Sequence, residues 1–140
     1  MILNKMAQTV VLLMISLCFM PACTTKTISS PKPGMLAVKI LPALDVQIVQ
    51  ASARQEGDYL MVNGQIKRKK VHARKFPRGH IDIALLDADG KTIYKTFTKY
   101  SPEILPRLHG VKSYFSAKIA AVPPPGSLVV VKFHSGPHDS

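Results

Sequence analysis

Apolar and polar residues alternate at every second position in several short segments of this chain, and prolines or glycines separate these segments. The clearest examples span residues 59–66 and 80–86, where the large aliphatic side chains share one face of an extended backbone. This period of two predicts half-buried β-strands. The aliphatic residues concerned are Leu60, Val62, Ile66, Ile81, Ile83 and Leu85.

Four further segments predict strands: residues 44–49 and 113–119 alternate in the same way, residues 92–100 are rich in Thr, Tyr and Ile with lysines interleaved, and residues 128–133 are mostly apolar. After residue 49 the alternation shifts phase, which indicates a β-bulge or a first strand that changes sheets. About six or seven strands at turn-separated intervals predict an all-β fold, namely a small antiparallel β-sandwich. We expect Val130 of the last strand to point into its core, together with Ile83 and Leu85.

Helix is hard to place in this pattern. Residues 101–108 have no strand periodicity, but Pro102 and Pro106 limit any helix there to about one turn. We therefore expect a short crossing, in which Leu105 and Leu108 close the open end of the sandwich.

The N-terminal segment predicts export. Lys5 precedes a short apolar run over residues 10–19, followed by Pro21 and Ala22. This order is typical of a secretory signal peptide, and the run is too short to span a bilayer as a stable helix. A polar tract follows as far as Gly34 and is typical of a tether. We predict a signal peptide over 1–22, a tether with a modified cysteine over 23–37 and the β-sandwich over 38–140.

The tetrapeptide Met20-Pro21-Ala22-Cys23 resembles the lipobox of bacterial lipoproteins. The resemblance implies that Cys23 is lipidated and becomes the new N-terminus, which anchors the chain to a membrane. Thr24 stands where a retention signal would place Asp, which by the same resemblance implies an outer-membrane lipoprotein facing the periplasm. With Cys18 in the signal peptide and Cys23 lipidated, the domain has no cysteine left for a disulfide.

The charge balance points to anionic surfaces. The net charge is +11, and one connection between strands concentrates seven cations. Contact with anionic lipid or glycolipid is one interpretation of this stretch, and a solvated connection that protects strand edges is the other. Nucleic acid is not expected, because Phe76 is the one aromatic residue of the stretch. The seven residues are Lys67, Arg68, Lys69, Lys70, Arg74, Lys75 and Arg78.

Residues 83–87, followed by Ala88-Asp89-Gly90-Lys91, resemble the strand and hairpin of FxLYD-type immunoglobulin-like domains of bacterial envelope proteins. Ile83 stands in place of the family's Phe, and Leu86 in place of its Tyr. The resemblance implies an immunoglobulin-like fold without shared catalytic residues. The Asp-Gly turn also explains residues 87–90 without a calcium loop, since Thr98 occupies the position of the required Glu.

The five histidines leave a surface zinc or copper site open as an alternative. His134 and His138 have a helical spacing, but Gly136 and Pro137 exclude a helix there, so we assign no metal ligand. The histidines are His72, His80, His109, His134 and His138.

The sequence indicates no catalytic residues and no cofactor. We predict a non-enzymatic, lipid-anchored periplasmic module that supports an envelope protein assembly. The alternatives are a basic module that contacts anionic lipid through residues 67–78 and, third, a periplasmic metal-binding protein.

Overall fold

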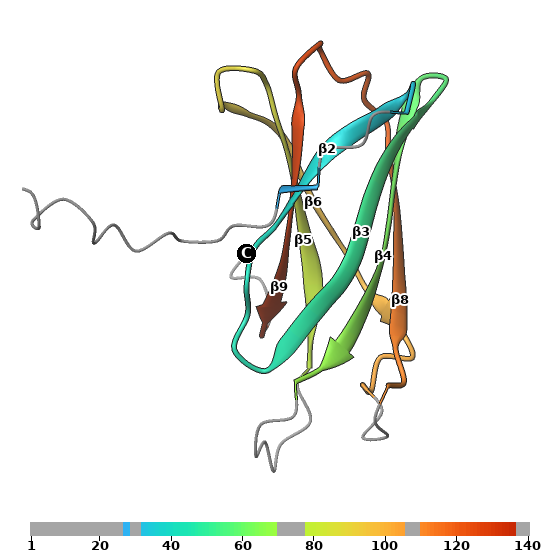
Figure 1. Cartoon of the computed structure of the whole chain (residues 1–140), viewed down its shortest axis with the longest axis vertical. Coiled ribbons are helices and arrows are strands. Elements are labelled where there is room, and N and C mark those ends of the chain that lie inside the picture. The colour runs from blue at the N-terminus through green and yellow to red at the C-terminus, as the bar shows by residue number, and fades with distance from the viewer. Residues whose placement is uncertain (1–26, 29–31, 70–77, 106–109, 137–140) are drawn as a thin grey trace, which may run out of the picture.

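The computed structural model describes residues 27–28, 32–69, 78–105 and 110–136, which form nine β-strands and no helix (Figure 1). The all-β prediction is confirmed. The part of the chain that the structure describes contains no helix long and apolar enough to cross a membrane. The strands are β1 (Thr27–Ile28), β2 (Met35–Ile40), β3 (Val46–Glu56), β4 (Tyr59–Arg68), β5 (Gly79–Leu86), β6 (Thr92–Thr98), β7 (Tyr100–Ser101), β8 (Ser113–Ile119) and β9 (Leu128–Ser135).

All nine strands belong to one sheet. Its order is β6-β5-β9-β2-β3-β4-β8-β7, and β1 pairs with β2 off this path. Strand β2 serves both halves of the sheet, because Met35 and Leu36 pair with β3 whereas residues 37–40 pair with β9. The β2–β9 pair is parallel and the other pairs are antiparallel, so the prediction of a purely antiparallel sheet is wrong at this point.

The two ends of the sheet meet. Strands β6 and β7 lie at opposite ends of the strand order, yet Lys99 alone separates them in the chain. In Figure 1, β6 crosses behind the other strands toward β8. There the Thr98 hydroxyl donates a hydrogen bond to the Ser116 carbonyl oxygen at 2.8 Å. The sheet is therefore nearly barrel-shaped, and the expected two-layer sandwich of six or seven strands is not confirmed.

The strand that links the two halves lies where the sequence predicts a tether. The sheet includes β1 (Thr27–Ile28), which lies wholly within the predicted tether over 23–37, and β2 begins at Met35, three residues before the expected domain start at residue 38. Gly34 adopts φ +79° and its carbonyl oxygen accepts a hydrogen bond from the backbone N–H of Gln55 at 2.8 Å. The residues ahead of β2 are polar and rich in proline, so the sequence did not predict β2 as a strand. Its backbone is nevertheless paired along both edges. Residues 1–26, with Cys23 and the predicted signal peptide, lie outside the described residues.

The core lies inside the curved sheet and follows the predicted alternation. Ile83 and Leu85 are each 1% exposed, which confirms their inward direction. Val130 is half-buried on the outer face, while its neighbours Val129 and Val131 are fully buried, so the prediction for Val130 is wrong. Val129, and not Val130, is the register partner of Leu85. The inward-facing positions of β9 are therefore shifted by one residue from those that the sequence predicts.

Two smaller predictions are confirmed. The phase shift in the first predicted strand is a β-bulge in β3, where the register with β4 shifts between Ile48 and Gln50. Leu105 is fully buried against the core, as its predicted packing role requires. Leu108 lies outside the described residues.

Candidate metal centre

Two histidines face each other across neighbouring strands. His80 on β5 and His134 on β9 are register partners, and Asp82 lies two residues further along β5. The intervening Ile81 and the β9 residue Phe133 are buried in the core. Because successive side chains of a strand point to opposite faces, His80, Asp82 and His134 share the outer face of the sheet.

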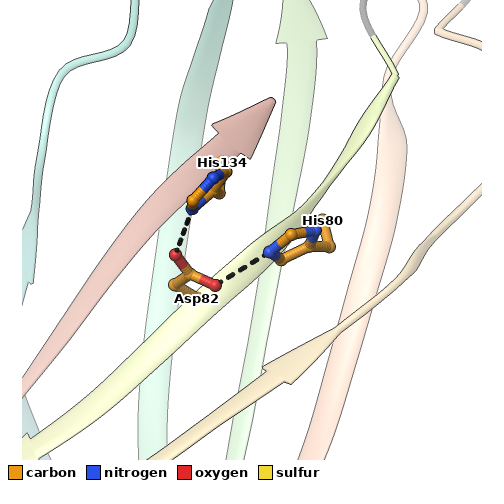
Figure 2. A group of neighbouring side chains, drawn as sticks. All are labelled: His80, Asp82 and His134. Carbon is orange, nitrogen blue, oxygen red and sulfur yellow. Dashed lines mark hydrogen bonds and ion pairs between the residues drawn. The ribbon is translucent and has the colours of Figure 1, made fainter. Parts of the chain in front are cut away.

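The Asp82 carboxylate lies between the two imidazoles (Figure 2). Its Oδ1 atom is 3.0 Å from His80 Nε2, and its Oδ2 atom is 3.1 Å from His134 Nδ1. One carboxylate therefore contacts both rings. Each contact is an ion pair when the histidine is protonated.

Ring contacts hold His80 in place. Its imidazole stacks on that of His134, with centroids 5.0 Å apart and an interplanar angle of 22°. Its ring centroid lies 5.3 Å from that of Phe97 on β6, and the two rings meet edge to face at an interplanar angle of 62°. These neighbours leave His80 8% exposed, although it lies on the outer face of the sheet. Asp82 and His134 keep 29% and 39% of their side chains exposed, so small ions can reach the cluster from solvent.

The cluster matches the donor set of a transition-metal site. One ligand atom from each of the three residues lies within 4.8 Å of the others. Metal–ligand bonds of about 2.0–2.2 Å in a tetrahedral site place ligand atoms about 3.3 Å apart. The two Asp82–histidine contacts of 3.0 and 3.1 Å, which different oxygens of the carboxylate make, are close to this spacing. Two imidazole nitrogens and one carboxylate suit Zn²⁺ or Cu²⁺, with water completing the coordination.

One cation opposes metal binding. Lys132, an exposed residue of β9, is the register partner of Asp82. Directly paired residues of antiparallel strands have Cβ atoms about 4.5–5.5 Å apart, so the Cβ atom of Lys132 lies close to that of Asp82. Its positive charge weakens the attraction of the cluster for a divalent cation.

The sequence prediction assigned no metal ligand, whereas the structure brings His80 and His134 together. The detectable signal is His-x-Asp at the start of a strand, which places His80 and Asp82 on one face. What the sequence could not provide is the pairing of β5 with β9, because more than forty residues separate the two strands. His72, His109 and His138 lie outside the described residues, so the structure does not test the spacing of His134 and His138.

The predicted anionic-surface stretch is described in part. Lys67 and Arg68 belong to strand β4 and are half-buried, so the connection begins later than the sequence predicts. The Lys69 ammonium donates a hydrogen bond to the Ala43 carbonyl oxygen. Arg78 is exposed. The remaining predicted cations, Lys70, Arg74 and Lys75, lie outside the described residues.

The Asp87 turn is a hairpin turn, as predicted. Its Oδ1 atom accepts hydrogen bonds from the backbone amides of Asp89 at 3.0 Å and Lys91 at 2.9 Å. Gly90 adopts φ +81°, a conformation that glycine reaches without steric cost. The Asp87 carboxylate therefore stabilises the turn between β5 and β6.

No protein-family model, no curated protein and no solved structure matches this chain. The FxLYD-type relationship stays a prediction.

Proposed function

We propose that this protein binds a divalent transition-metal ion, Zn²⁺ or Cu²⁺, through His80, Asp82 and His134. The observation that carries this proposal is the placement of three ligating side chains on two directly paired strands, with contacts of 3.0 and 3.1 Å. Paired strands are rigid elements, so little conformational entropy is lost when the ion binds. The general order of metal affinities favours Cu²⁺ over Zn²⁺ at such a site.

The proposed role is metal binding without catalysis, within the envelope module that the sequence predicts. Lipidation at Cys23 would hold this module at the membrane, where it would meet metal ions of the periplasm. The same proposal includes a relationship of the domain to immunoglobulin-like domains and an accessory role in an envelope protein assembly. The metal site itself depends on neither of these two parts.

Isothermal titration calorimetry of the purified protein with Zn²⁺ and with Cu²⁺ tests the proposal. We expect one ion per chain, and His80→Ala should weaken binding by about 100-fold, equal to about 2.7 kcal/mol. Asp82→Asn should also weaken it, because the amide is a poorer ligand than the carboxylate. Affinity should fall at acidic pH, since protons compete with the metal for the imidazole nitrogens.

His138→Ala and Asp89→Asn are matched controls. Asp89 is an exposed residue of the β5–β6 turn, away from the cluster in the chain, and its replacement should leave metal affinity unchanged. Loss of binding in His138→Ala, with His80→Ala unaffected, would assign the ion to the C-terminal histidine pair instead. Binding of equal strength in all variants would refute a specific site.

A substitution that strengthens binding gives a sharper test. Lys132→Gln removes the cation opposite Asp82, so metal affinity should rise by about two- to five-fold, equal to about 0.4–1 kcal/mol. Lys95→Gln makes the same charge change at an exposed position of β6 that pairs with Ala84. An equal gain in both variants would indicate a general effect of net charge and not a local one.

The proposed anchor is tested separately. Mass spectrometry of the mature protein from its native host should find a lipid-modified N-terminus at Cys23. Cys23→Ser should abolish the modification, because the thiol is the attachment point. An unmodified mature terminus at another residue would contradict the anchor and leave the metal site untouched.

A further inference from the structure

The outer face of β3, β4 and β8 carries two neighbouring cross-strand rows of uncharged polar side chains. In one row Ser52 pairs with Asn63, which pairs with Ser116. In the other row Gln50 pairs with Gln65, which pairs with Tyr114. We call these six residues the polar grid: Gln50, Ser52, Asn63, Gln65, Tyr114 and Ser116.

The polar grid lines a hollow. Its six residues, together with the segment around Lys99 and Glu103, border an open cavity of about 620 Å³. Small-molecule sites of proteins measure about 300–1,000 Å³, so the hollow has room for a compact ligand. Lys99 and Glu103 pair with each other at 3.2 Å on its border, which balances their charges.

The grid differs from the ordinary solvated surface of this protein. The next row of the same three strands is Arg54, Met61 and Lys118, and the outer face of the opposite half presents Lys95 and Lys132. In a chain of net charge +11, the grid replaces such cations by two hydroxyls, three amides and a phenol. None of the six grid side chains carries a charge that would attract an anionic headgroup, phosphate or polynucleotide, and the Lys112 ammonium beside them is bonded to Gln65 Oε1.

The chemistry of the grid fits a carbohydrate. Each Asn or Gln amide offers donors and an acceptor, and each hydroxyl offers both, which matches the sugar hydroxyls that also donate and accept. Tyr114 is 58% exposed and presents an amphipathic ring against which the apolar face of a sugar can lie. We propose that the polar grid binds an uncharged glycan. This proposal is independent of the metal site, which lies on the other half of the sheet.

Parts of the grid are held in place before any ligand arrives. The Lys112 ammonium donates a hydrogen bond to Gln65 Oε1 at 2.9 Å, which fixes the amide orientation and leaves its NH₂ group as the donor. The bulge at Val49 brings Gln50 opposite Gln65 despite the odd spacing in β3. Preorganised groups on paired strands bind with a smaller loss of side-chain entropy.

The test uses two-dimensional ¹H–¹⁵N NMR of the protein, titrated in turn with tetra-N-acetylchitotetraose, cellotetraose and maltotetraose. We expect at least one of these probes to shift the resonances of the polar grid, while those of His80 and His134 stay in place. Tyr114→Ala should weaken that binding by about tenfold, and Tyr114→Phe should retain most of it because the ring remains. Asn63→Ala should weaken it through the lost hydrogen bonds.

Tyr94→Ala is the matched control, since Tyr94 is an exposed tyrosine of β6 outside the grid. The amide spectrum of each variant reports whether it is folded, so a loss of binding cannot be confused with unfolding. The proposal is overturned if none of the three probes shifts the grid resonances at millimolar concentrations. It is equally overturned if Tyr94→Ala weakens binding as much as Tyr114→Ala does.

Discussion

The ring of Phe115 lies over Gly64, its register partner on the adjacent strand. A Cβ atom added at Gly64 would stand 2.2 Å from Phe115 Cζ and 2.6 Å from the Gln50 carbonyl oxygen. Phe115 is 3% exposed, so its ring fills the space that a side chain at position 64 would occupy. Aromatic side chains that cover a strand glycine in this way compensate for its weak packing.

Gly64→Ala should therefore destabilise the fold, although alanine is normally the better residue in a strand. We expect a loss of about 1–3 kcal/mol in the free energy of unfolding, the usual cost of overpacking. Urea denaturation measures it. Ser116→Ala, an exposed change on the partner strand, should cost less than about 0.5 kcal/mol. Equal stability of Gly64→Ala and the parent would show that the ring and the β3 backbone can move aside.

Leu85→Ala should cost about 2–5 kcal/mol, because it removes a fully buried side chain and leaves a cavity in the core. Lys95→Ala, on the neighbouring strand, should be nearly neutral because Lys95 is exposed.

Val130→Ala tests the corrected phase of strand β9. Val130→Ala should lower the free energy of unfolding by less than Val129→Ala does, since Val129 is fully buried and Val130 is half-buried. The reverse order in urea unfolding would contradict the phase that the structure assigns to β9.

Ionisation of the Tyr100 phenol should lower the free energy of unfolding at alkaline pH. Burial, with a smaller contribution from the charge of Glu103, raises the pKa of its phenol above the ordinary 10.0. The native state therefore keeps a proton that the unfolded state loses, so the contribution is fully present below about pH 10 and is lost as pH rises above it. Unfolding free energies measured between pH 8 and 11 should fall less steeply in Tyr100→Phe than in the parent. Tyr114→Phe, which changes an exposed tyrosine, is the control and should follow the parent.

The basic stretch predicts binding to acidic vesicles. At about 1 kcal/mol for each cation near an anionic surface, replacing Lys70, Arg74 and Lys75 by Gln should weaken vesicle binding by about 100-fold. Lys69 is left unchanged, since its ammonium bonds the Ala43 carbonyl oxygen. High salt should also weaken binding through screening.

A second triple variant controls for net charge: Lys32, Lys91 and Lys95, all exposed, replaced by Gln. Vesicle sedimentation compares the two variants at the same ionic strength. If both bind equally weakly, the attraction belongs to the whole basic surface. If neither differs from the parent, the stretch is a solvated connection.

The sequence by itself determined the all-β class and most of the strands, because a strand with one buried face must alternate. It also determined the irregularity near Val49, for which a bulge was one of two interpretations, and the Asp87 turn, since phase shifts and Asp-Gly pairs act over a few residues. Strand β2 escaped detection. Five of its six residues are half-buried and Val38 is fully buried, so its two faces do not differ clearly in exposure. The sequence of β2 therefore has no clear alternation of apolar and polar residues.

The tertiary structure alone decided how distant strands pair. Sheet order depends on contacts between segments far apart in the chain, and local periodicity contains no information on them. The parallel β2–β9 pair, the near closure through Lys99 and the opposition of His80 and His134 all arise at this level. The same holds for the polar grid, whose six residues come from three strands and share one surface through register alone.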